Sequence, residues 1–207
     1  MNPIQSTILR AALAGCLAWG MAAGAKAQMS EGGTPPSFRY EQTLRSRAAK
    51  ETVAVNFNVD DEKLVDSWRE SEGLAPRCVS RLIDVKMNPH NAGVWSTLPD
   101  GQTIWQLEIE ARGAQALMLY YADFLIPEGG RLYLYNKDKS ELLGAYTHAT
   151  NPDGGRFATG FVSGDAVTLE YAPGPDGRRP QLEIEAVGYG YNLPEGDRIW
   201  RQGAQLR

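Results

Sequence analysis

The hexapeptide QLEIEA occurs twice, at residues 106–111 and 181–186, and its glutamates are the clearest candidates for acid–base chemistry in this chain. They are Glu108, Glu110, Glu183 and Glu185. Glycosidases use two carboxyl groups, one of which has a pKa raised by an apolar pocket so that it can donate a proton. In a β-strand, however, these glutamates alternate with leucine and isoleucine and share one wet face, which offers no such pocket. The pattern therefore favours a solvated sheet face, paired to arginines such as Arg112, over a catalytic pair.

The other residue types that carry chemistry do not form a catalytic set. His90 and His148 are far apart in the chain, and neither lies in a metal-binding spacing. Ser163 and Asp165 stand in the wrong order for the nucleophile loop of a serine protease and are typical of a tight turn. Aspartates in glycine-bearing turns can bind calcium, but turn formation alone explains Asp100, Asp153, Asp165 and Asp176. We expect no enzyme activity, no cofactor and no metal site.

The elements that would position these residues are strands, because short alternating runs separated by Pro and Gly clusters fill the chain after residue 50. Strands are predicted at 53–59, 79–87, 103–111, 115–124, 131–136, 142–147, 156–162, 166–171 and 181–191. Residues 60–73 predict the one helix, with Asp60 or Asp61 as its N-cap and with Leu64, Val65 and Trp68 on one face. This spacing of turns predicts a single all-β domain, an antiparallel, jelly-roll-like β-sandwich.

The first 27 residues are typical of a secretory signal peptide. A short start with one positive charge is followed by an apolar stretch and by AKA at 25–27, the form of a cleavage site. The sequence LAGC at 13–16 offers an alternative, a lipoprotein anchored through acylated Cys16. Only a few apolar residues precede Cys16, so we favour ordinary secretion to the periplasm or the exterior. The apolar stretch is too short for a stable membrane span, and no later stretch comes closer.

Charge and cysteine content exclude further functions. The formal net charge of −4 becomes −6 when Arg10 and Lys26 leave with the signal peptide. A mildly acidic protein lacks the basic face that binding to nucleic acid requires. Only Cys78 would remain as a cysteine, so the mature chain could form no internal disulfide, and we expect Cys78 to act as a small buried hydrophobic residue.

The aromatic residues mark a surface that something should cover. Tyrosines and leucines alternate on adjacent predicted strands, so both faces of this part of the sheet carry apolar surface. The second sheet with the N-terminal arm, a neighbouring protein domain, or a stacked sugar could provide the cover. We take Tyr120, Tyr133, Tyr135 and Trp95 as the candidate docking face.

A series of short motifs between residues 75 and 191 resembles a known family. The series comprises Gly93 with Trp95, Trp105 with Ile109, Phe124 before PEGG, LYLY at 132–135, Gly164-Asp165, Glu170-Tyr171, and GYGY at 188–191. In this order the motifs resemble the non-catalytic N-terminal region of bacterial lysyl endopeptidases and related secreted serine proteases. The resemblance implies a β-sandwich prodomain that assists the folding of a trypsin-like protease domain, in cis or in trans, or keeps it inactive. The catalytic residues of that family have no matching positions before Arg207.

Together these features predict the organisation and function of the chain. We expect a signal peptide at 1–27, a flexible linker or arm at 28–50, the β-sandwich at 51–191 and a tail or linker at 192–207. The expected function is that of a secreted, non-catalytic domain that binds a trypsin-like peptidase. The alternative is a carbohydrate-binding module of a secreted or cell-surface protein, in which Trp95, Tyr133 and Tyr135 would stack on a glycan.

Overall fold

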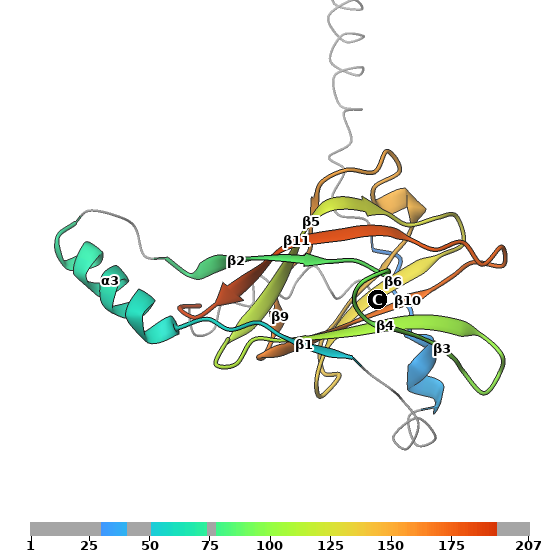
Figure 1. Cartoon of the computed structure of the whole chain (residues 1–207), viewed down its shortest axis with the longest axis horizontal. Helices are drawn as coiled ribbons and strands as arrows, with labels where there is room; N and C mark the ends of the chain where they lie inside the picture. The colour runs from blue at the N-terminus through green and yellow to red at the C-terminus, as the bar shows by residue number, and fades with distance from the viewer. Residues whose placement is uncertain (1–29, 41–50, 74–77, 194–207) are drawn as a thin grey trace, which may run out of the picture.

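The described part of the chain forms two β-sheets that pack face to face, with one α-helix beside them (Figure 1). The computed structural model describes residues 30–40, 51–73 and 78–193. The predicted signal peptide, Cys16, and residues 194–207 of the predicted tail lie outside the described residues. The all-β sandwich expected from the alternating runs is confirmed.

Sheet A has six strands and sheet B has five. Sheet A runs in the order β1 (Thr52–Ala54), β4 (Thr103–Glu110), β10 (Ala166–Ala172), β6 (Arg131–Asn136) and β7 (Leu142–Tyr146), with β3 (Val94–Thr97) also paired to β4. Sheet B runs in the order β2 (Ser80–Met87), β11 (Gln181–Gly190), β5 (Ala116–Leu125) and β8 (Phe157–Ala158), with β9 (Val162–Ser163) also paired to β5. Every strand pair is antiparallel except β1 with β4. Two 3₁₀ helices, η1 (Pro36–Tyr40) and η2 (His148–Thr150), complete the connections.

The two QLEIEA segments lie on β4 and β11, one in each sheet. Leu107 and Ile109 of β4 point into the space between the sheets, as do Leu182 and Ile184 of β11, and all four are buried in one core. The glutamates of each segment point outward and are partly exposed. The hexapeptide thus has the same role in each sheet: it forms a strand with one face in the core and the other toward solvent.

Two predicted strands differ from the structure, each for a local reason, and one strand was not predicted. The run 53–59 is a strand only to Ala54, because Asn58 caps a helix that begins at Val59. The run 156–162 is divided, because the Thr159 hydroxyl accepts a hydrogen bond from the Leu119 backbone N–H, which interrupts the ladder. Strand β3 was not predicted, although its valine, tryptophan and threonine are typical of strands.

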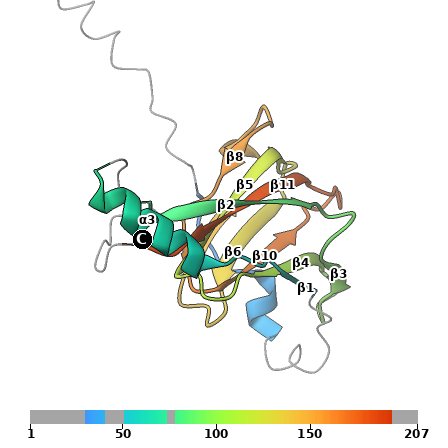
Figure 2. The same ribbon diagram turned by 60° about the vertical axis from the view of Figure 1, so that its left-hand side comes forward.

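The helix α3 (Val59–Ser71) is where the sequence predicts it, but its cap and its packing differ. Asn58 caps it by accepting a hydrogen bond from the Asp60 backbone N–H, so neither Asp60 nor Asp61 is the N-cap. Its apolar residues share one face but do not pack on the core. Figure 1 shows the helix to one side of both sheets, and in Figure 2 this end of the molecule comes forward.

Candidate docking surfaces

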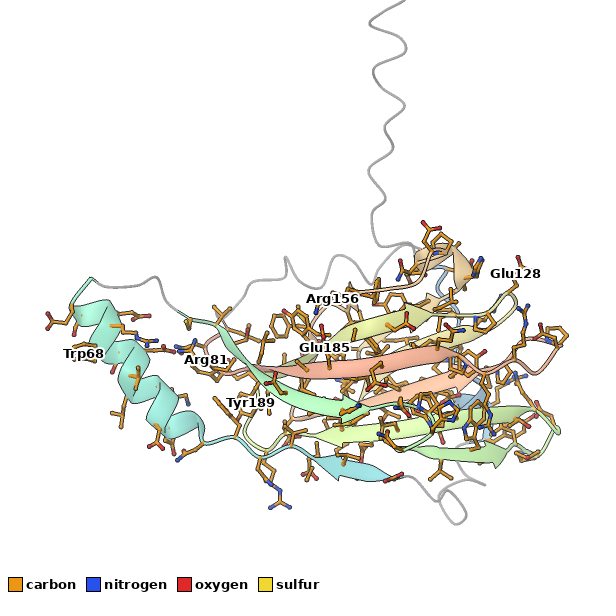
Figure 3. The ribbon with its side chains drawn as sticks, turned by 45° about the horizontal axis from the view of Figure 1, so that its top comes forward. Trp68, Arg81, Glu128, Arg156, Glu185 and Tyr189 are labelled. Atoms are coloured by element: carbon orange, nitrogen blue, oxygen red, sulfur yellow. The ribbon has the colours of Figure 1, made fainter. Side chains whose placement is uncertain are left out.

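The glutamates of the two QLEIEA segments cannot act as one catalytic pair, because they point outward from opposite sides of the sandwich. On sheet A, Glu110 lies 3.5 Å from Arg112. On sheet B, Glu185 lies 3.5 Å from Arg156, and Glu183 accepts a hydrogen bond from Asn88. Figure 3 labels Glu185 and Arg156. Each carboxylate is held by its own neighbours on a partly exposed face, as expected for a solvated sheet surface.

Three other candidate side chains, those of Ser163, His148 and Asp176, each contact neighbouring groups of the fold. The Ser163 backbone N–H and hydroxyl both donate to the Glu141 carboxylate, at 2.9 and 2.7 Å. Nδ1 of His148 lies 3.2 Å from the Ile126 carbonyl oxygen. The backbone N–H of Arg178, with its side chain, holds the pKa of the Asp176 carboxyl below its ordinary value. Within residues 30–40, 51–73 and 78–193, no three His, Cys, Asp or Glu side chains gather closely enough to hold a metal ion.

Tyr133 and Tyr135, two of the four predicted docking residues, lie on the outer face of sheet A and are 2% and 4% exposed. The neighbours of these tyrosines along β6, Leu132 and Leu134, point into the core instead. Residues 30–40 cross this outer face, where Gly33 lies beside the Tyr133 hydroxyl and Phe38 packs against Tyr135. We call this segment the arm. The alternative in which the N-terminal arm covers the tyrosine face is the arrangement that the structure adopts.

The arm is attached to sheet A along its length. At edge strand β7, the Glu31 backbone N–H donates to the Ala145 carbonyl and the Ala145 N–H donates to the Gly32 carbonyl, at 3.0 and 3.1 Å. Farther along, the Phe38 ring meets the Tyr135 ring edge-on, with centroids 4.9 Å apart. The Lys139 ammonium lies 4.4 Å from the centroid of the Phe38 ring. The arm therefore binds as an added strand at one end and as an aromatic anchor at the other.

A fully buried carboxylate, that of Glu170 on β10, lies under the middle of the arm. It accepts hydrogen bonds from the Ser37 backbone N–H at 2.9 Å, from the Ser37 hydroxyl at 2.5 Å, and from Tyr135 and Gln106 at 3.0 Å each. Burial, with the nearby Glu170 charge, raises the pKa of Tyr135 far above its ordinary value, so that its hydroxyl remains a donor. The sequence indicates Glu170 only as part of a family motif. Its burial is not predicted, because an acidic residue on an alternating strand is typical of a solvent-exposed face.

Trp95 lies apart from the tyrosines, on β3 at one end of the sandwich. It stands opposite Trp105 in the ladder and packs against the core from the inner side of sheet A. The Arg179 guanidinium lies 4.9 Å from the centroid of its ring. Both line a hollow of about 650 Å³, together with Gln102, Thr103, Gly129, Pro173, Gly174, Pro175 and Gly177. Trp95 therefore shares no surface with Tyr133 or Tyr135.

Tyr120, the fourth predicted residue, lies on the outer face of sheet B and is half-buried. In the next row of the ladder, Leu82, Gly188 and Met118 stand side by side on β2, β11 and β5. A side chain at Gly188 would meet the Met118 Cβ and the Tyr120 ring at 3.3 and 3.4 Å, so the glycine leaves room for both neighbours. Leu82 is 57% exposed. The part of this face around Leu82 is therefore apolar and open.

Helix α3 is fixed to the same end of sheet B by one buried carboxylate. The Arg81 guanidinium donates to the Asp66 carboxylate at 2.8 Å, and the Tyr191 hydroxyl donates to its other oxygen. Figure 3 shows Arg81 on the side of the helix toward the sheets and Trp68 away from it. The helix therefore turns a polar residue inward and leaves its apolar residues outside.

The large hydrophobic residues that are exposed in the described part of the chain gather at this end. They are Leu64 at 69%, Val65 at 41%, Trp68 at 58% and, one position after Arg81, Leu82. We call these residues the α3 end. The spacing of Leu64, Val65 and Trp68 predicts that they share one helix face, but nothing in that spacing indicates that the face is exposed.

No protein-family model matches the chain.

Among the residues that the structure describes, no helix combines the length and the apolar run that crossing a bilayer takes.

Proposed function

We propose that this chain is a secreted, non-catalytic β-sandwich domain that docks on a trypsin-like serine peptidase, to assist its folding or to keep it inactive. The observation that carries the proposal is the α3 end, where the exposed large hydrophobic residues of the described chain gather. Large hydrophobic side chains that are exposed together in one region of a soluble protein mark a place where another macromolecule binds. The identity of the partner follows from the family that the motifs of residues 75–191 resemble.

Because Tyr133 and Tyr135 are buried, the proposed docking site lies on another part of the surface. The arm already fills the face on which they lie, so a partner would have to displace it. Leu82 and the half-buried Tyr120 on sheet B, with Trp68 on α3, need no rearrangement before they can be covered. An exposed tryptophan is also the residue type that contributes most often and most strongly to protein interfaces.

Refolding of a secreted trypsin-like peptidase from the same organism tests this function. We expect the full chain to raise the yield of active peptidase or to slow its activity, and we expect the double variant Trp68→Asp, Leu82→Asp to do neither. Thr97→Asp, a new charge at an exposed position of β3, should behave like the unaltered chain. No effect on yield or activity, with no heat of binding by calorimetry, would refute the proposal.

A glycan-binding function keeps one supporting observation, the hollow that Trp95 and Arg179 line. The arm covers two of the three rings that the alternative requires, so a sugar would meet Trp95 alone. Glycan-array binding that is lost in Trp95→Ala and retained in the Trp68→Asp, Leu82→Asp variant would favour this second function.

A further inference from the structure

Asp60, Leu64 and Trp68 of helix α3, with its C-cap residue Glu72, form a ridge in which each residue lies about 40° around the helix from the one before it. All four side chains are exposed. At 100° per residue, Leu64 and Trp68 lie about 160° around the helix from Asp66. Because Asp66 is the residue that fixes the helix to Arg81 and Tyr191, the ridge must face away from the sandwich. The ridge is apolar in the middle and acidic at both ends.

The acidic group at the start of the ridge stabilises the helix, whereas the one at its end does not. Asp60 lies in the first turn, where the helix dipole favours a negative charge. Glu72 is the C-cap residue and Glu70 lies in the last turn, where the dipole favours a positive charge. Within the described residues, neither glutamate forms an ion pair. Helix stability therefore accounts for Asp60 but not for Glu72.

The charges of the ridge favour a protein over a lipid surface as its natural partner. Amphipathic helices that lie on membranes carry Lys and Arg beside their apolar face, because lipid headgroups supply negative charge. The ridge has a carboxylate at each end, which anionic headgroups would repel. A protein surface with positive charge complements it instead.

We infer that the ridge is recognised by an apolar groove on a protein partner, with a basic side chain at each end of the groove. The groove receives Leu64 and Trp68, and its basic groups meet Asp60 and Glu72, whose α-carbons are about 18 Å apart along the helix axis. This inference rests on the proposed function, because it specifies how the peptidase would be recognised. It makes Glu72 a specificity-determining residue.

Binding of the full chain to two designed helical hairpins tests the recognition chemistry directly. Both hairpins present the same leucine-lined groove, and one has lysines at its ends where the other has glutamates. We expect the lysine hairpin to bind about 10-fold more tightly, and the difference to shrink at roughly 0.5 M NaCl, where charges are screened within a few ångströms. Equal binding of the two hairpins would overturn the inference.

Variants on and off the ridge provide matched controls. Glu72→Lys should lower affinity for the lysine hairpin about 10-fold, whereas Glu70→Lys makes the same charge change in the same turn but on the opposite side of the helix, and should not. Trp68→Ala should lower affinity by about 30-fold, as for a central interface aromatic residue. Circular dichroism checks that each variant is folded. A Glu70→Lys effect equal to that of Glu72→Lys would overturn the inference.

The peptidase assay separates this inference from the proposed function. If the peptidase binds the full chain and is indifferent to Glu72→Lys, the docking function stands and the recognition chemistry is wrong. If the lysine hairpin is preferred but the peptidase does not bind, the ridge is right and the proposed partner is wrong. Sedimentation that shows self-association lost in Trp68→Ala would assign the ridge to a second copy of this chain and overturn the inference.

Discussion

The outer faces of the two sheets both carry large apolar or aromatic side chains, but they differ in whether another segment of the chain covers them. Sheet A presents Tyr133 and Tyr135, and sheet B presents Tyr120 with Leu82. The arm closes the first face, and it ties itself there through Glu170 and through backbone pairing with β7. No described segment closes the second face over Leu82. Tyrosine and leucine on outward strand positions thus indicate that a face is apolar, but not what covers it.

The largest difference that we predict between the two faces is in the cost of losing a tyrosine. Tyr135→Ala removes a buried ring from between the arm and the sheet, and should lower the free energy of unfolding by about 3–5 kcal/mol. Tyr120→Ala, on the half-buried face of sheet B, should cost less than half as much. Urea denaturation of both variants measures the difference. Equal losses would show that the two faces are covered to the same extent.

The second prediction compares a buried with an exposed carboxylate. Glu170→Ala leaves donors of Ser37, Tyr135 and Gln106 without an acceptor, and should lower stability by about 2–3 kcal/mol. Glu183→Ala on sheet B removes a partly exposed acceptor of Asn88, which water can replace, and should change stability by less than about 0.5 kcal/mol. Thermal unfolding of the pair provides the test. A Glu170→Ala variant as stable as the unaltered chain would show that the arm does not depend on this carboxylate.

The third prediction concerns the open face. Leu82→Thr should alter stability by no more than about 0.5 kcal/mol, since water already reaches more than half of this side chain. The adjacent Ile83 packs against the core, so Ile83→Thr is the matched control and should destabilise the protein clearly more. A loss above about 1 kcal/mol in Leu82→Thr would mean that a segment of the chain covers this face in solution. Denaturation midpoints of the two variants decide the question.

The smallest predicted effect is a loosening of the arm in acid at its Tyr40 end. The Gln102 backbone N–H, with the Tyr40 hydroxyl and nearby Arg39, holds the pKa of Asp100 below its ordinary value of 3.8. A lowered folded-state pKa means that the stabilisation is complete above the ordinary pKa and is lost as the pH falls below it. NMR titration of the Asp100 carboxyl and the Tyr40 ring should show the change together. In Asp100→Asn, the shift of Tyr40 over this pH window should disappear.

Local pattern was sufficient to predict most of the secondary structure. Residues 131–136 form a strand with the boundaries that the sequence predicts, and Leu107 and Ile109 are buried where their alternation with glutamate places them. The helix was found from its spacing, but its cap was assigned two or three positions too late, because Asn58 was read as part of a strand. These features depend on neighbours in the chain, which the sequence displays directly.

The candidate site could not be predicted in the same way. Tyr133 and Tyr135 were correctly identified as apolar positions on a second face, but the sequence left three kinds of cover open for them. Trp95 was grouped with these tyrosines although it faces the inner side of the same sheet. A pattern of alternation gives the direction of each side chain relative to its own strand, but it does not tell which surfaces meet.

The sequence by itself determined the strands, the helix and the dry face of each layer, because pleating and helical periodicity act over a few residues. Only the tertiary structure decided that Glu170 is buried, that the arm covers the tyrosines, and that Leu64 and Trp68 face outward. Those outcomes depend on contacts such as Ser37 with Glu170, which join positions 133 residues apart. Whether such distant segments meet is set by the packing of the whole domain, and no local pattern encodes it.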